Sequence, residues 1–214
     1  KATQPSSKTP SADPMVYAFR NMVPVVHPTA FVHPQATLIG HVTVGPDCYV
    51  GPHAVLRGDW GKIELERGVN VQEGCVIHMF PGNTVHLAEG AHVGHGAMVH
   101  GATLGKNCMI GMNAVILDDA VIGEECIVGA LALVKARSVF EPRSLVVGHP
   151  AEVKGQVSDA MVAHKTEGTA LYQRLPADCH DSLVEVEPFT EAPLDRVEDF
   201  PSFETWQNRK AKTS

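Results

Sequence analysis

Aliphatic residues recur at every sixth position through the middle of this 214-residue chain. An amphipathic α-helix repeats its apolar residues at three and four positions, and an amphipathic strand alternates strictly, so neither produces a period of six. A fixed period of this kind is typical of repeat architectures, in which each unit packs on the next. The repeated aliphatic residues are Val26, Val32, Leu38, Val44, Val50, Leu56, Leu65, Val71, Ile77, Leu87, Val93, Val99, Leu104, Ile110, Ile116, Ile122, Val128 and Val134.

A small or β-branched residue stands four positions after most of these aliphatic residues, as at Cys48, Ala54 and Cys75. One short strand per hexapeptide and three strands per coil would form a triangular prism that holds one large and one small side chain per face. The pattern therefore predicts an all-β solenoid, a parallel β-helix. Eighteen hexapeptide steps give six coils, about 29 Å of prism at roughly 4.8 Å per coil.

Composition narrows the possible partners. Hydrophobic residues make up 44% of the chain and charged residues 19%, and no apolar run is long enough to span a membrane. The net charge is −7 without a basic cluster, so we expect neither a nucleic acid nor a membrane as partner. No signal peptide follows Met15, which predicts a cytoplasmic protein.

The chain divides into four parts by composition. A helix from about Asp159 to Arg174, capped by Ser158, is expected to cover the last coil, and a short second helix is expected over Asp181–Val186. The predicted parts are an expression-vector remnant (1–14), the β-helix (15–150), a C-terminal helical segment (151–187) and an extended tail (188–214) that aromatic residues could clamp on a neighbouring subunit.

Candidate metal ligands gather where the repeat is irregular. Assigning the steps to faces by threes places Leu56, Ile77 and Val99 on one face, so the residues after them, Arg57, His78 and His100, are stacked on successive coils. Two imidazoles about 4.8 Å apart can share one metal ion, because Zn–N bonds are about 2.0–2.1 Å long.

A third ligand has to come from elsewhere in the assembly. His95 belongs to the neighbouring face of the prism and should point away from His78 and His100. Packing of prisms around a three-fold axis would bring His95 of one subunit to His78 and His100 of the next. The residues therefore predict a homotrimer with three interfacial metal sites.

Several motifs along the chain are characteristic when taken together. They are Val25-Val26-His27-Pro28-Thr29-Ala30-Phe31-Val32-His33-Pro34, Leu56-Arg57-Gly58-Asp59, Asn70-Val71-Gln72, Val93-Gly94-His95-Gly96 through Val99-His100-Gly101, Gly111-Met112-Asn113-Ala114-Val115 and Val121-Ile122-Gly123-Glu124. With these motifs the chain resembles the γ-class carbonic anhydrase family of hexapeptide-repeat proteins, and more closely its PaaY/CaiE branch, the phenylacetic-acid degradation and carnitine-operon proteins. The resemblance covers roughly residues 17–187.

This resemblance implies a left-handed β-helix, a trimer, and a metal held by His78, His95 and His100. The metal would be zinc, or another divalent ion such as iron or cobalt. By the same resemblance Gln72 would bond the metal-bound water, and Arg57 and Asp59 would pair near the subunit boundary and orient an anionic substrate.

The chain departs from the archetypal γ-carbonic anhydrases at three places. Trp60 and the run Met79-Phe80-Pro81 stand where those enzymes carry glutamates proposed to move protons. Glu73 replaces a usual aspartate and could shift the pairing of Arg57. CO₂ hydration releases a proton that must be exported at every turnover, so the absence of these glutamates disfavours an efficient anhydrase.

The PaaY resemblance implies a thioesterase that acts on CoA thioesters of the phenylacetate pathway, with metal hydroxide attacking the thioester carbonyl. A thiolate leaving group with a pKa of about 8.5 departs with little proton donation. The alternatives are a γ-type carbonic anhydrase, a hexapeptide acyltransferase, which would use a single catalytic histidine without metal, and a non-catalytic assembly subunit.

Overall fold

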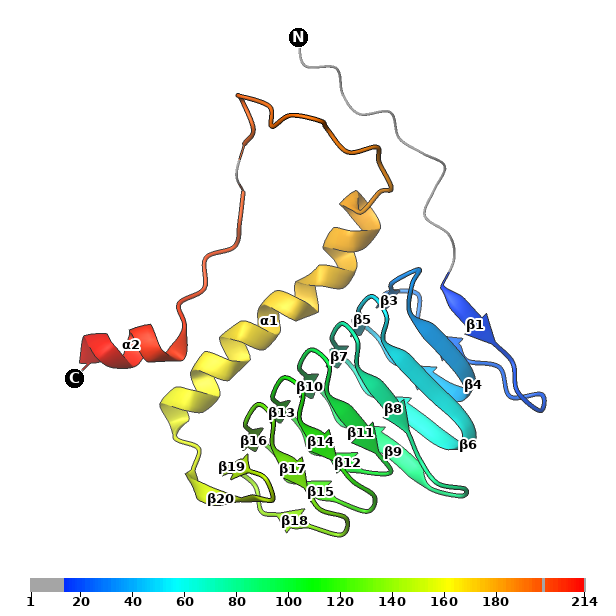
Figure 1. Ribbon diagram of the computed structural model, residues 1–214, viewed down its shortest axis with the longest axis vertical. Coiled ribbons are helices and arrows are strands. Elements are labelled where there is room, and N and C mark those ends of the chain that lie inside the picture. Colours follow the sequence, from blue (N-terminus) through cyan, green and yellow to red (C-terminus); the bar gives the residue numbers. More distant parts are fainter. Residues whose placement is uncertain (1–13, 198, 214) are drawn as a thin grey trace.

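The chain forms a parallel β-solenoid followed by a C-terminal helix (Figure 1). The structure, a computed structural model, describes residues 14–197 and 199–213. Apart from Pro14, the predicted vector remnant lies outside the described residues. The six-residue period therefore predicts the architecture correctly, and each coil contributes one short strand to each of three faces.

The first two faces share one 12-stranded sheet, because β4 (Thr37–Val44) and β6 (Val55–Leu65) continue around a corner. The start of β6 pairs with β8 (Val76–His78), and its end pairs with β9 (Thr84–Leu87). The first face continues with β11 (Met98–His100), β14 (Val115–Ile116) and β17 (Leu133–Val134). The second face comprises β2 (Val25–Val26), the ends of β4 and β6, β9, β12 (Thr103–Leu104), β15 (Val121–Ile122) and β18 (Val139–Phe140). The short strand β1 (Met15–Tyr17) pairs with the start of β4.

The third face is an eight-stranded sheet in which only the last strand is antiparallel. Its strands are β3 (Phe31–Val32), β5 (Tyr49–Val50), β7 (Asn70–Val71), β10 (His92–Val93), β13 (Met109–Ile110), β16 (Ile127–Val128), β19 (Ser144–Gly148) and β20 (Ala151–Gln156). Seven parallel strands mean about seven turns, one more than the six predicted. The winding continues past Val134 because Phe140 and Val146 still fill the inward position. Strand β20 also carries the sheet beyond the predicted end of the β-helix at residue 150.

Strand register confirms the assignment of residues to the first face. Leu56 pairs with Ile77, Ile77 with Val99, and Val99 with Ile116. These side chains are fully buried and stack along the axis of the prism as one continuous core. A large-to-small change at such a position costs about 2–5 kcal/mol, so each residue of this column contributes substantially to the stability of the solenoid.

Four cysteines occupy the small inward position, as expected. Cys48, Cys75, Cys108 and Cys126 are buried as free thiols, and Cys179 lies in the C-terminal helix. Burial raises the pKa of the Cys48 and Cys108 thiols to about 12 and that of Cys75 to about 11. The thiolate, which is the nucleophilic form, is therefore disfavoured at all three, and they act as small apolar residues.

The C-terminal helix α1 (Asp159–Ser182) runs along the third face (Figure 1). Ser158 caps it as predicted, since its Oγ accepts a hydrogen bond from the Met161 N–H at 3.3 Å. The predicted end at Arg174 and the predicted second helix over Asp181–Val186 are both wrong. Helix α1 continues to Ser182 because its last turn docks on the first coil, where His180 Nε2 lies 3.0 Å from the Ala30 carbonyl.

The segment after α1 is not entirely extended, which corrects the prediction for residues 188–214. A helix, α2 (Trp206–Thr213), forms near the end of the chain. Its residues contact α1 of the same chain: Arg209 forms an ion pair with Glu167 at 2.7 Å, and Trp206 lies against His164 with ring centroids 5.5 Å apart. Trp206 is one of the aromatic residues that the sequence suggested for contact with a neighbouring subunit, and it contacts its own chain here. None of the helices among the described residues is long and apolar enough to cross a membrane.

Lys165 attaches the middle of α1 to the solenoid. Its ammonium group donates to the Gly90 carbonyl at 3.0 Å and to Asn107 Oδ1 at 2.5 Å, and its side chain is buried. Burial lowers the pKa of Lys165 to about 8, although the nearby Cys108 and Glu125 oppose the shift. Since the unfolded chain holds this proton up to about pH 10.4, it binds more protons than the folded chain between these values.

We therefore predict that titration of Lys165 increases the free energy of unfolding by on the order of 2 kcal/mol as the pH rises from 8 to 10. The measurement is the difference in free energy of unfolding between the wild type and Lys165→Met, from urea titrations at pH 7.5 and pH 10. Lys135→Met, which removes an exposed lysine, is the control. A wild-type advantage over Lys165→Met that stays constant or shrinks with pH would contradict the prediction.

Candidate functional site

Two histidines are paired on the first face. His78 at the end of β8 and His100 at the end of β11 are direct register partners. Their side chains meet with His78 Nδ1 3.2 Å from His100 Nε2. The predicted stacking of these two imidazoles is thus present, and it follows from the parallel pairing of adjacent coils.

A carboxylate holds the far nitrogen of each imidazole. Asp59 Oδ1 lies 3.0 Å from His78 Nε2, and Asp118 Oδ1 lies 2.7 Å from His100 Nδ1. Arg57 donates from Nη1 to the second oxygen of Asp59 at 2.8 Å, which is the predicted ion pair. Both ring orientations are fixed from outside, as is usual for histidines that bind metals.

These bonds decide which ring nitrogens carry protons. A carboxylate only accepts hydrogen bonds, so in each neutral ring the proton lies on the nitrogen that faces Asp59 or Asp118. His78 Nδ1 and His100 Nε2 then present lone pairs to each other across 3.2 Å. Two facing lone pairs are unfavourable unless a proton or a cation lies against both.

A transition-metal ion fits this pair of nitrogens. Tetrahedral zinc with Zn–N bonds of about 2.0–2.1 Å separates two ligand nitrogens by about 3.3–3.4 Å, close to the distance found here. Burial lowers the pKa of His78, and the nearby Arg57 and His100 add to this against the hydrogen bond of Asp59. A lowered pKa keeps the imidazole in the neutral form that metals require.

Burial opposes the ionisation of Asp59, but the hydrogen bonds from Arg57 and His78 outweigh it and hold the pKa of this carboxyl below its ordinary value. The carboxylate is therefore charged at neutral pH, which maintains the orientation of His78.

Aromatic rings border the two imidazoles. The Trp60 ring lies 5.3 Å from the His78 ring, and the Phe80 ring lies 5.0 Å from the His100 ring, between centroids. Arg57 stacks over Trp60 with its guanidinium carbon 5.6 Å from the ring centroid. Both aromatic side chains are about half exposed, so the positions that would hold shuttle carboxylates carry apolar surface instead.

His95 belongs to a second cluster, at the corner that follows the third-face strand β10. Its Nδ1 lies 2.5 Å from Glu73 Oε2, and its backbone N–H donates to Gln72 Oε1 at 3.2 Å. Glu73 also accepts from the Tyr49 hydroxyl at 3.0 Å, so it pairs with His95 and does not disturb Arg57. Burial opposes ionisation of Glu73, but hydrogen bonds, including those from Tyr49 and His95, keep its pKa below the ordinary value.

Gln72 is buried beside His95 and not beside the His78 and His100 pair. Its Nε2 donates to Asn70 Oδ1 at 3.1 Å and approaches His92 Nε2 at 2.7 Å. The structure thus brings together Arg57, Asp59, His78 and His100, and separately Gln72 and His95.

A single chain contains only part of the predicted metal site. Among the residues that the structure describes, no three His, Cys, Asp or Glu side chains form a metal-binding group. The two clusters lie on different parts of the coil, as the sequence predicts for a site shared between subunits. The shared site itself stays a prediction.

Asp118 is a site residue that the sequence analysis missed. It follows His100 by 18 residues, which is one uninterrupted coil, so the repeat length was the available signal. Gly101 leaves room for it, because a Cβ at Gly101 would lie 2.5 Å from Asp118 Oδ1. His92 and its contact with Gln72 were missed as well.

Comparisons with known proteins agree with the fold. A family model described as bacterial transferase hexapeptide (six repeats) matches residues 24–58 and 101–136. Carnitine operon protein CaiE of Citrobacter koseri is 48% identical over 180 residues, which is 84% of this chain and 91% of that protein. CaiE of Escherichia coli O157:H7 is 47% identical over 172 residues, 80% of this chain and 88% of that protein.

Two solved structures share the solenoid. A hexapeptide transferase family protein from Anaplasma phagocytophilum is 27% identical with a TM-score of 0.74, covering 77% of this chain and 97% of that one. A Bacillus cereus protein described as an acetyltransferase is 28% identical with a TM-score of 0.78, covering 79% and 99%. The relatives with high identity support the CaiE side of the predicted PaaY/CaiE branch, and they lend no support to the phenylacetate pathway.

The contact between Gln72 and His92 predicts the protonation of His92. The Gln72 amide N–H group donates to His92 Nε2, so the ring proton lies on Nδ1. Burial, together with the charges of Lys165 and His95, lowers the pKa of His92 to about 3. We predict that ¹⁵N NMR shows a neutral ring protonated on Nδ1 throughout pH 5–8. Gln72→Glu, which replaces the donor by an acceptor, should move the proton to Nε2. A titration midpoint above pH 5 in the wild type would show that the prediction is wrong.

Proposed function

The chain belongs to the hexapeptide-repeat family of the carnitine operon proteins CaiE, and from this premise we propose that it is a metal-dependent hydrolase of CoA thioesters. The observation that supports this most strongly is the pair His78 and His100, two imidazoles 3.2 Å apart whose outer nitrogens are each held by a carboxylate. A divalent transition-metal ion bound there supplies hydroxide at neutral pH and polarises a carbonyl oxygen.

The residues of the chain would then have distinct roles. His78 and His100 from one subunit, with His95 from a neighbour in a homotrimer, hold zinc, or iron or cobalt in its place. Asp59 and Asp118 hold the two imidazoles in orientation, each through the outer ring nitrogen. Gln72, which lies against the His95 backbone, arrives with His95 from the neighbouring subunit and bonds the attacking oxygen.

The borders of the site favour thioester hydrolysis over CO₂ hydration. Trp60 and Phe80 cover the imidazoles with apolar rings and provide no group that takes up a proton. A thiolate leaves with little proton donation, whereas rapid hydration of CO₂ needs a relay that carries a proton away at every turnover. Arg57, which pairs with Asp59 and stacks on Trp60, lies where it can attract an anionic substrate.

Two acyl groups are candidates for the substrate. The motif resemblance to PaaY suggests intermediates of phenylacetate degradation. The name of the CaiE relatives suggests the CoA thioester of carnitine. Both substrates share the thioester, so the same site would serve either.

Acyl transfer is the second candidate function. It is favoured by the match to a transferase family model and by the fold shared with the Bacillus cereus protein described as an acetyltransferase. A transferase would use the CoA thioester as acyl donor and would require an added acceptor, so turnover in water alone separates the two functions.

The test is hydrolysis of a panel of CoA thioesters that includes those of carnitine and phenylacetate. We predict that metal-loaded protein hydrolyses at least one of them, and that a chelator or His78→Ala lowers kcat/KM at least about 100-fold. Asp118→Asn should weaken metal affinity about 10- to 100-fold, because a neutral amide bonds the outer nitrogen of His100 less strongly than the carboxylate does and makes the ring a weaker ligand.

Asp119→Asn is the matched control, since the Asp119 carboxylate accepts from Asn83 at 3.3 Å instead of a histidine, and it should leave metal content and turnover unchanged. Absence of turnover in protein shown to contain metal, or turnover that a chelator leaves intact, would contradict the proposal. Turnover only with an added acyl acceptor would favour a transferase.

A further inference from the structure

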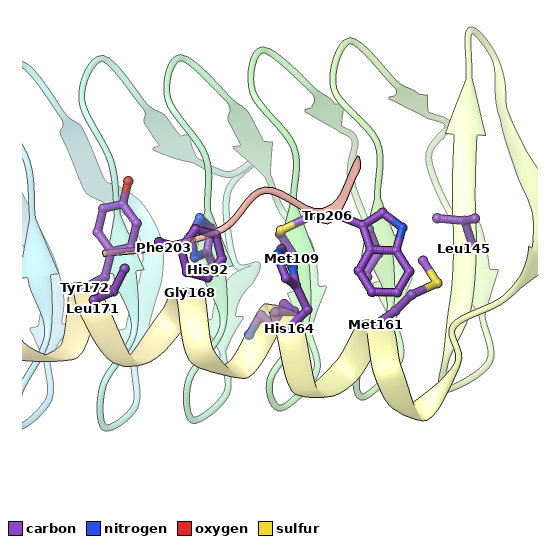
Figure 2. Close-up of a pocket in the computed structure, with 12 residues that line it drawn as sticks. His92, Met109, Leu145, Met161, His164, Gly168, Leu171, Tyr172, Phe203 and Trp206 are labelled. Carbon is purple, nitrogen blue, oxygen red and sulfur yellow. The ribbon is translucent and has the colours of Figure 1, made fainter. Parts of the chain in front are cut away.

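An elongated cavity of about 640 Å³ lies between the third face of the solenoid and helix α1 (Figure 2). This volume is within the range of ligand pockets, about 300–1,000 Å³. The cavity is separate from the His78 and His100 pair, which lies on the first face. None of its lining residues takes part in the proposed hydrolysis.

The solenoid wall of the cavity is a ladder of side chains at one register position. His92 pairs with Met109, Met109 with Ile127, and Ile127 with Leu145. These four side chains point outward from successive coils toward α1. Three coil spacings make the ladder about 14 Å long, which matches an extended chain of about ten carbons.

Helix α1 and the C-terminal segment form the other walls. Met161 and Leu171 of α1 face the ladder, and Phe203 and Trp206 line the opening between the two (Figure 2). His164 holds this segment in place, with its Nε2 2.7 Å from the Glu204 carbonyl and its ring 4.8 Å from that of Phe203. Methionine side chains at both walls can adapt to a flexible apolar chain.

One end of the cavity carries hydrogen-bond donors. Lys165 places its buried ammonium group there, beside the coils of Gly90 and Asn107. His92 lies at the same end, and its Nδ1 is buried without a hydrogen-bond partner. The contact with Gln72 puts the ring proton on this Nδ1, so it is an unsatisfied donor. A buried donor without an acceptor destabilises the folded chain, and a ligand oxygen that accepts from it would remove this penalty.

We propose that this cavity binds an unbranched acyl chain of about ten carbons, with its carbonyl or carboxylate oxygen at His92 and Lys165. The apolar ladder accommodates the chain, and the donors at one end select an acceptor or anionic head over a cationic one. The chemistry is shared by a free fatty acid and by the acyl part of a thioester. The proposal rests on the cavity alone and holds whether or not the first-face site hydrolyses thioesters.

A short chain of hydrogen bonds connects the cavity to the predicted catalytic residues. His92 meets Gln72, and Gln72 accepts the N–H of His95. An oxygen bound at His92 Nδ1 would polarise this chain of hydrogen bonds, so an acyl ligand could bias the position of Gln72.

Binding is measured on the full chain by titration calorimetry and by tryptophan fluorescence. The chain has two tryptophans, so Trp60→Phe leaves Trp206, at the cavity, as the one emitter. Decanoate should bind and shift the Trp206 emission to shorter wavelength. Butanoate, with six fewer methylene groups, should bind more than about 100-fold more weakly. Decyltrimethylammonium, which has the same chain and a cationic head, should not bind.

Decanoyl-CoA distinguishes the two sources of the chain. Binding of decanoate alone identifies a site for the free acid, and binding of both identifies one that also admits the thioester. Either result supports the proposal, and binding of neither overturns it.

Ile127→Phe fills the middle of the ladder and should weaken decanoate binding more than tenfold. Val121→Phe is the matched control, since Val121 holds the outward position of strand β15 on the second face. Equal affinity of the two variants for decanoate would overturn the proposal. If Ile127→Phe does not fold, the chain-length series decides, and equal binding of butanoate and decanoate to the wild type would overturn it.

Discussion

Parallel in-register stacking of successive coils is the constraint on which this structure depends. Each uninterrupted coil takes 18 residues, so side chains 18 positions apart are neighbours in space. The buried side chains of Leu38 and Leu56, which are register partners, show this inside the prism. On the surface the same stacking places Asp118 beside His100, 18 positions earlier, and it places His100 beside His78 across a coil that an insertion lengthens to 22 residues. The core and the candidate site are thus two consequences of one register.

The outward side chains divide the surface into zones with different chemistry. The first face carries carboxylate-held imidazoles beside exposed aromatic rings, and the corner after β10 carries His95 with Glu73 and Gln72. The third face carries an apolar ladder that α1 covers incompletely. A rigid solenoid keeps these zones at fixed spacings, because each strand is bonded to the coils on both sides. Such a scaffold suits a site whose ligands come from two subunits.

Much of the solenoid could be predicted from the sequence, because the period of six has no other common explanation. The face assignment and the stacking of His78 on His100 followed from counting residues, whereas the ion pair of Arg57 with Asp59 followed from the family resemblance. The end of α1 and the helix α2 could not be predicted, since both depend on docking contacts between segments far apart in sequence. The cavity could not be predicted for the same reason, because it forms only where α1 and the C-terminal segment pack against the ladder.

In the proposed site, His95 of one subunit joins His78 and His100 of the next, and complementation between subunits tests this sharing of ligands. His78→Ala and His95→Ala chains carrying different tags would be co-expressed, and mixed trimers purified and analysed for metal. Each mixed trimer contains one interface with all three histidines intact. A site shared in this way predicts one tightly bound metal ion per mixed trimer and none in either parent trimer. Metal retained by a parent trimer, or absent from the mixed ones, would contradict it.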